Sequence, residues 1–292
     1  MKFLLTAFPF IFFLQANAQT QAEWAQTVNW DGVSHWSKYM KVRAAWMGPN
    51  ALAVPFISNG SIDSNSTAGI SGQFHFREGD KTQTIALYGN ICLVKDLISF
   101  DISYIPYEFY TMSDAVKKER HVYHQFYNDK KARGDVLVNT NIQIFNRWRK
   151  DIQLALRVGY RLPSSSGFGA ARFIDGMGYH IDISAAKPFN AIALKWIAMA
   201  GFYVWQIEQD DFRQNDAFLF GTGLEWSPKN WLVKSYVAGY LGYIENSGDK
   251  PIVFRAEAQR RISKIGLLLR FQQGLNDFEY STAEVGGKYY FK

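Results

Sequence analysis

Cysteine and long apolar runs are scarce in this sequence, and each shortage excludes a class of protein. Cys92 is the only cysteine among 292 residues, so no framework of intramolecular disulfides can form. Beyond the N-terminus no stretch of about 18 or more apolar residues occurs, which excludes a protein that crosses a membrane with helices. Disorder is excluded as well, because 48% of the residues are hydrophobic and provide ample surface for burial.

Aromatic residues, in contrast, are abundant. The chain has 23 Phe, 16 Tyr and 9 Trp, which together make up 16% of its residues. The mean hydropathy is nevertheless −0.18, and charged residues account for only 20%. This composition indicates a large β-rich protein.

Residues 1–18 have the pattern of an export signal. Met1 and Lys2 give a positive start, Phe3–Leu14 is apolar, and Ala16-Asn17-Ala18 is the small-x-small pattern that signal peptidase accepts. An anchor helix is the alternative, but this short apolar run cannot span a bilayer. We therefore predict cleavage after Ala18 and a mature chain that begins at Gln19.

From about residue 67 onward, apolar and polar residues alternate with a period of two, which is typical of half-buried strands. In 149–161, for example, Leu156, Val158 and Tyr160 share one face, whereas Arg157 and Arg161 share the other. We predict twelve strands, at approximately 66–76, 81–91, 97–110, 133–147, 149–162, 172–187, 191–206, 215–228, 231–245, 251–261, 264–273 and 280–292.

Three features favour a membrane barrel over a soluble sandwich, whose strands also alternate. Tight turns alternate with longer loops, as in outer-membrane barrels with short periplasmic turns, although the first hairpin at 78–80 is an exception. Aromatic residues gather at strand ends, as girdles do. The periplasmic set is Trp148, Phe189, Trp226, Trp231, Tyr289 and Phe291, and the outer set is Tyr104, Tyr107, Tyr160, Phe218, Tyr243, Phe271 and Tyr280. An even strand count also returns both barrel ends to the periplasm.

In this architecture the chain resembles the monomeric outer-membrane β-barrels of Gram-negative bacteria. The resemblance covers about 66–292 and includes the last strand, Glu284–Lys292, which alternates and carries an aromatic residue next to its end. In that class, a C-terminal strand with a terminal aromatic residue is the signal for the barrel assembly machinery. Here Lys292 follows Phe291, so the match departs by one residue.

Residues 19–65 differ from the rest of the chain and are predicted to be an N-terminal extension outside the barrel wall. Trp24, Trp30 and Trp36 recur every six residues, but the segment has no sustained alternation of apolar and polar residues. The extension either plugs the lumen or packs on the periplasmic rim. A further strand pair, 39–46 and 50–58, would give fourteen strands, but Pro49 and Pro55 disfavour it.

If the more apolar strand faces contact lipid, a set of polar and charged side chains points into the lumen. The candidates are Arg77, Asp135, Arg157, Arg161, His180, Asp182, Lys195, Glu225, Lys234, Arg255, Glu257, Arg270 and Glu284. Such residues either fill the lumen with rigid ion pairs or line a narrow channel, because twelve strands enclose more space than about eight but less than the 16 or so of an open porin.

Catalytic and metal sites are not predicted. His180, Asp182 and Ser184 follow one strand face, but alternate residues are about 6.6 Å apart, too far for a catalytic triad. His121 and His124 in the loop 111–132 have a helical ligand spacing without a third ligand. These two residues and His75 are the candidate bases of an alternative function, an enzyme acting on outer-leaflet lipid.

The sequence thus predicts a narrow channel or passive transporter in the outer membrane for small polar or anionic solutes. The alternatives are the lipid-acting enzyme and a non-conducting structural component. Expected partners are outer-membrane lipid, lipopolysaccharide near the basic loop 111–132, the barrel assembly machinery and a small solute. No cofactor and no nucleic acid are expected.

Overall fold

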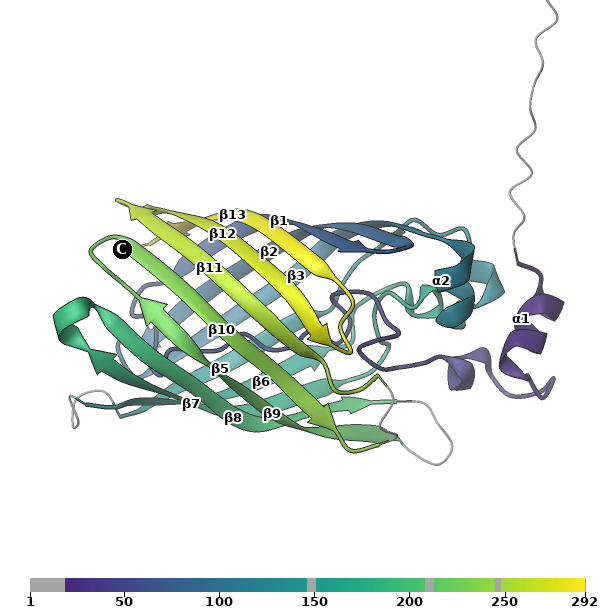
Figure 1. Cartoon of the computed structure of the whole chain (residues 1–292), viewed down its shortest axis with the longest axis horizontal. Coiled ribbons are helices and arrows are strands. Elements are labelled where there is room, and N and C mark those ends of the chain that lie inside the picture. Colours follow the sequence, from purple (N-terminus) through teal and green to yellow (C-terminus); the bar gives the residue numbers. More distant parts are fainter. Residues whose placement is uncertain (1–18, 146–150, 208–212, 245–247, 292) are drawn as a thin grey trace, which may run out of the picture.

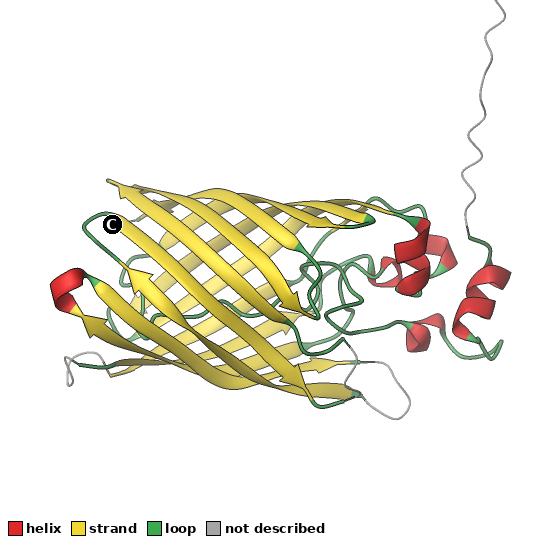
Figure 2. Ribbon diagram, viewed as in Figure 1, coloured by secondary structure: helices red, strands yellow, loops and turns green. Residues whose placement is uncertain are grey.

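The computed structural model describes residues 19–145, 151–207, 213–244 and 248–291, and antiparallel strands dominate it (Figures 1 and 2). The twelve long strands are β1 Thr67–Arg77, β2 Asp80–Val94, β3 Ile98–Met112, β5 Val136–Phe145, β6 Gln153–Leu162, β7 Gly178–Phe189, β8 Leu194–Gln206, β9 Gln214–Trp226, β10 Trp231–Gly242, β11 Ile252–Ile262, β12 Ile265–Asn276 and β13 Ser281–Tyr290. A thirteenth, two-residue strand, β4 Lys131–Ala132, pairs with β3.

Helices are short and lie outside this wall. They are α1 Gln21–Val28, α2 Asp114–Glu119 and the 3-10 turns Trp36–Tyr39, His124–Phe126, Phe168–Ala170 and Asn190–Ile192. In the part of the chain that the structure describes, no helix is long and apolar enough to cross a membrane.

The twelve long strands close into a barrel. Each pairs antiparallel with its neighbour along the chain, and β1 pairs with β13 from Thr67↔Tyr290 to Phe76↔Ser281. The predicted all-β fold, a transmembrane type of antiparallel up-and-down barrel with twelve strands, is confirmed.

Side chains alternate between the outer surface and the interior, as the period of two requires. On β7, Ile181 and Ile183 are exposed, whereas Asp182 and Ser184 are buried. Exposed apolar side chains of this kind occur on the strands all around the barrel, including Phe74, Leu87, Ile102, Leu137, Tyr160, Ile183, Trp196, Phe218, Leu241, Leu269 and Val285. A continuous apolar outer surface of this extent needs a lipid environment.

The two ends of the barrel differ in the length of their connections. At one end, which we call the short-turn end, the connections include 95–97, 190–193, 227–230 and 263–264, and the strands begin and finish there at Thr67 and Tyr290. The opposite, long-loop end carries 113–135, 163–177, 207–213, 243–251 and 277–280. The hairpin at 78–79 is the short connection at this end.

One predicted strand start and one predicted girdle residue are wrong. The strand expected from 172 begins at 178, because the preceding residues belong to a loop, whereas the other approximate strand bounds agree with the structure to within four residues. Tyr280, expected in the outer girdle, is only 2% exposed and lies inside the barrel mouth. Trp148 lies outside the described residues.

The N-terminal extension runs through the barrel (Figure 1). In the figure, α1 lies beyond the long-loop end near α2, and the purple chain passes from there along the lumen to the start of β1. Residues 40–58 contain no strand, so the fourteen-strand alternative is wrong. Residues 19–40 lie at the end opposite to the C-terminus.

Candidate functional site

Aromatic side chains join the start of the extension to the long loop 113–135. Trp24 is 1% exposed, and its indole Nε1 donates to the carbonyl oxygen of His121 at 3.1 Å. Trp36 stacks on Tyr123 with ring centroids 5.0 Å apart, and Trp30 lies 6.2 Å from Trp24. The three regularly spaced tryptophans therefore meet in one cluster, although no single helix or strand face holds them.

A buried apolar layer lies behind this cluster, inside the long-loop half of the lumen. It combines residues of the extension with inward side chains of the strands and of the long loops, among them Met40, Val42, Met47, Leu52, Val122, Ile174, Trp205, Tyr240 and Tyr280. The sequence predicted inward polar and charged side chains but did not indicate this apolar filling. It closes the long-loop end against water.

Four buried charges cross-link the same end. Asp80 accepts from Arg120 Nη1 at 2.8 Å and from Arg172 Nη1 at 2.7 Å, and Arg172 Nε also donates to Glu108 at 2.8 Å. All four side chains are fully buried. These ion pairs link β2, β3, the loop 113–135 and the loop 163–177 across the long-loop end of the barrel.

Asn50 connects the extension to these buried ion pairs. Its Nδ2 lies 2.8 Å from Glu108 Oε2 and 3.1 Å from Thr84 Oγ1. His75 is buried beside it, with its Nδ1 2.8 Å from Thr282 Oγ1. The histidine is therefore part of the packed interior.

Further along the lumen, side chains of the wall bind the main chain of the extension. Tyr240 OH donates to Leu52 O at 2.8 Å, and Arg255 Nη2 donates to Val54 O at 2.6 Å. Nearer the short-turn end, Gln143 Nε2 donates to Gly60 O at 2.8 Å. A Cβ at Gly60, whose φ is +69°, would lie 2.7 Å from the Gln153 carbonyl oxygen. Glycine therefore allows the close approach to β6.

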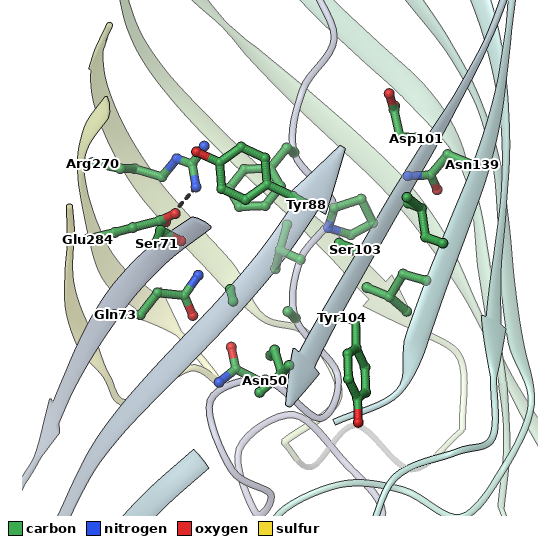
Figure 3. Close-up of a pocket in the computed structure, with 18 of the residues that line it drawn as sticks. Asn50, Ser71, Gln73, Tyr88, Asp101, Ser103, Tyr104, Asn139, Arg270 and Glu284 are labelled. Carbon is green, nitrogen blue, oxygen red and sulfur yellow. Dashed lines mark hydrogen bonds and ion pairs between the residues drawn. The ribbon is translucent and has the colours of Figure 1, made fainter. Parts of the chain in front are cut away.

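A cavity of about 500 Å³ remains between the extension and the opposite wall (Figure 3). Ser71 and Gln73 of β1 line it on one side, Asp101 of β3 and Asn139 of β5 line it on the other, and Tyr88 of β2 lies between them. Arg270 and Glu284, which form a 2.5 Å ion pair, lie on β12 and β13. This volume is within the usual range of small-molecule sites.

The predicted lumen residues lie on the inner side of the barrel, but they divide into two groups. Nine line the cavity: Asp135, Arg157, Arg161, His180, Lys234, Arg255, Glu257, Arg270 and Glu284. The remaining four do not line it. Arg77 lies at the long-loop rim, where it pairs with Glu119 and Glu279. Asp182 pairs with Arg157. Lys195 and Glu225 pair with each other towards the short-turn end.

Most of these charges have partners within the barrel. Arg157 Nε donates to Asp182 at 2.7 Å, and Arg270 Nε donates to Glu257 at 2.9 Å. Lys195 and Lys234 both lie near Glu225, at 3.4 and 3.6 Å. The lumen is thus stabilised by paired charges, and its basic side chains do not form a free positive surface.

The histidine candidates show no catalytic arrangement. Ser184 Oγ donates to Asp182 at 3.2 Å, and His180 Nε2 lies 3.7 Å from the same carboxylate, so serine and histidine flank the aspartate in file. His121 Nδ1 contacts Tyr39 O at 2.8 Å, and burial lowers the pKa of His121. Among the described residues, no group of three or more His, Cys, Asp or Glu side chains could hold a metal ion.

Comparisons with known proteins agree on the fold alone. No family model and no curated protein matches the chain. Among solved structures it is similar to the COG4313 outer membrane channel from Pseudomonas putida F1, with 11% identity, a TM-score of 0.57 and coverage of 82% of this chain and 100% of that one. The translocator domain of autotransporter NalP from Neisseria meningitidis has 10% identity, a TM-score of 0.50 and coverage of 80% and 91%. The chain therefore has the fold of an outer-membrane β-barrel.

Proposed function

We propose that the protein is a narrow outer-membrane channel for small polar solutes, with residues 19–65 acting as its plug. The observation that carries the proposal is a cavity, lined by polar as well as apolar side chains, inside a closed barrel with an apolar outer surface. Such a barrel places the short-turn end, which holds the C-terminus, in the periplasm and the long loops outside. Lipopolysaccharide and the barrel assembly machinery remain expected partners.

The contacts of the extension support a plug that can move. Wall side chains bind its main-chain carbonyl oxygens, such as those of Leu52, Val54 and Gly60, and its apolar side chains pack in the buried layer of the long-loop half. A neutral hydrogen bond of this kind contributes only about 0.5–1.5 kcal/mol and one donated by a guanidinium about 1.5–3 kcal/mol, so each can exchange with water. A displaced plug would join the cavity to the long-loop end.

The paired charges also refine the expected solute. Arg157 is bound to Asp182, and Arg161 contacts Tyr203 and lies 4.0 Å from Asp135. Because these bases are neutralised locally, we propose a solute that is polar and weakly selected by charge. The reversal potential of the channel in a salt gradient should accordingly lie close to zero.

A reversible disulfide tests the plug directly. A Cβ at Gly221 would lie 3.4 Å from Ile57 Cδ1, so the side chains at 57 and 221 are neighbours, and a disulfide between cysteines placed there in a Cys92→Ser background is verified by the loss of both free thiols on oxidation. Oxidation should abolish planar-bilayer current, and reduction should restore it. The single variant Ile57→Cys, which cannot cross-link, should conduct under both conditions.

Two results would contradict the proposal. Equal current in the oxidised and reduced double variant would show that the extension is not a gate. Absence of current in every variant and condition would instead favour the non-conducting structural component, which the closed long-loop end also fits.

A further inference from the structure

Five polar atoms around the lumen cavity are buried without a hydrogen-bond partner in the described part of the chain. They are Ser71 Oγ, Gln73 Oε1, Asn90 Oδ1, Arg161 Nη1 and His180 Nε2. All five residues line the same cavity. Buried polar groups in folded proteins normally have partners, so their concentration at one cavity points to a group that binds there.

Three of the five unpartnered atoms belong to side chains that another contact holds in place. Asn90 Nδ2 donates to Asp101 at 2.8 Å, which leaves Asn90 Oδ1 as an acceptor. Arg161 uses Nη2 on the Tyr203 hydroxyl, so Nη1 remains as a donor. His180 packs over Gly159, where a Cβ would lie 2.1 Å from the imidazole ring. Asn90, Arg161 and His180 are therefore oriented before any ligand arrives.

The donors and acceptors come from two separate parts of the barrel wall. Ser71, Gln73 and Asn90 belong to β1 and β2, whereas Arg161 and His180 belong to β6 and β7. Gln73 and Asn90 offer acceptors, Arg161 offers a donor, and the serine hydroxyl does both. A ligand with hydroxyl groups suits this mixture, because each hydroxyl donates one hydrogen bond and accepts others.

The charged and aromatic side chains of the lining further restrict the class of ligand that fits the cavity. Arg270 is paired with both Glu257 and Glu284, and Asp101 accepts from Asn90 and Asn141. An ionic ligand would have to break these pairs. Tyr88 and Tyr236 add ring surfaces to the lining, which suits the apolar faces of a sugar ring.

We propose that the cavity binds an uncharged, hydroxyl-rich small molecule of the mono- or disaccharide class. This proposal rests on the proposed channel function only for the route by which the ligand enters the lumen. The extension forms one wall of the site through Asn50 and Val54, so the site exists while the plug is in place.

Equilibrium binding to the detergent-solubilised full mature chain tests the site separately from conduction. The probes are methyl glucoside and maltose, with glucuronate and glucosamine as charged analogues, and the readout is titration calorimetry. Ser71→Ala and Gln73→Leu should each weaken binding of the neutral sugars by about three- to tenfold, the range expected for one lost hydrogen bond. Phe74→Leu, on the outer face of the same strand, is the matched control and should leave affinity unchanged.

Tighter binding of either charged analogue would overturn the proposal. So would no binding of the neutral sugars to a chain whose circular dichroism shows intact strands, since the unpartnered atoms would then contact ordered water only. A protein that binds sugar but carries no current would contradict the proposed channel function and support the proposed binding site. A protein that conducts but binds no sugar would support the channel function and contradict the binding site.

Discussion

At the scale of single residues, closure of the long-loop end depends most on Asp80. Its carboxylate accepts from Arg120, Arg172 and the Tyr280 hydroxyl at 2.6–2.8 Å, and no water reaches it. Removing the acid from a buried pair leaves uncompensated charge, which is strongly destabilising. We expect Asp80→Asn to lower the free energy of unfolding by about 3–5 kcal/mol, measured by urea titration in detergent.

Glu279→Gln is the matched control for this prediction. Glu279 also pairs with an arginine, Arg77, but its side chain is 47% exposed and Arg77 keeps a second partner in Glu119. An exposed pair contributes only about 0–1 kcal/mol. If the two substitutions destabilise the barrel equally, the buried network is not what holds this end closed.

These residues also mark the limit of prediction from the sequence. Arg120 and Arg172 lie on loops, where no periodicity indicates which way a side chain points. Glu108 was missed for a different reason. It faces inward although it is seven residues from the inward Asp101, because an irregularity opposite Ile85 and Leu87 shifts the phase of β3. Pro106 is the available signal, since proline within a strand is typical of a bulge.

At the scale of strands, the predicted phase is testable with one substitution on each face. Leu269, near the middle of β12, is 61% exposed and is expected to contact lipid. Arginine at the bilayer midplane costs about 2–4 kcal/mol in membrane barrels. Leu269→Arg should therefore reduce the yield of folded protein in lipid vesicles.

Gln73→Arg is the control on the inner face. Gln73 lines the lumen cavity and is paired in register with Glu284, so a guanidinium there meets a carboxylate. Its folding yield should remain close to that of the unchanged chain. The opposite order of yields would mean that the assigned inner and outer faces are exchanged.

Strands were predicted better than their surroundings for a physical reason. A wall between lipid and a polar lumen constrains every second residue, so Arg157, Arg255 and Glu257 could be assigned to the inner face from alternation alone. The residues of the extension are not constrained by two different environments in this way. Its tryptophans meet only because α1, the turn after it and the 3-10 turn Trp36–Tyr39 fold back together.

At the scale of the whole molecule, the described chain begins and finishes at opposite ends of the barrel (Figure 1). β1 starts at the short-turn end, yet residues 19–40 lie beyond the long-loop end, and the segment between them crosses the lumen. The extension cannot reach this position around the outside of a closed barrel. It must lie between the strands before β1 pairs with β13, or pass through the finished lumen.

This path predicts that the start of the mature chain is accessible from outside intact cells. Val33 is 90% exposed next to the aromatic cluster, and Ala191 is exposed in the turn between β7 and β8 at the other end. In a Cys92→Ser background, Val33→Cys should react with a membrane-impermeant maleimide on whole cells, whereas Ala191→Cys should react only after permeabilisation. Labelling of both sites only after permeabilisation would show that the extension does not cross the outer membrane. Labelling of Ala191→Cys alone on whole cells would show that the barrel is inserted in the opposite orientation.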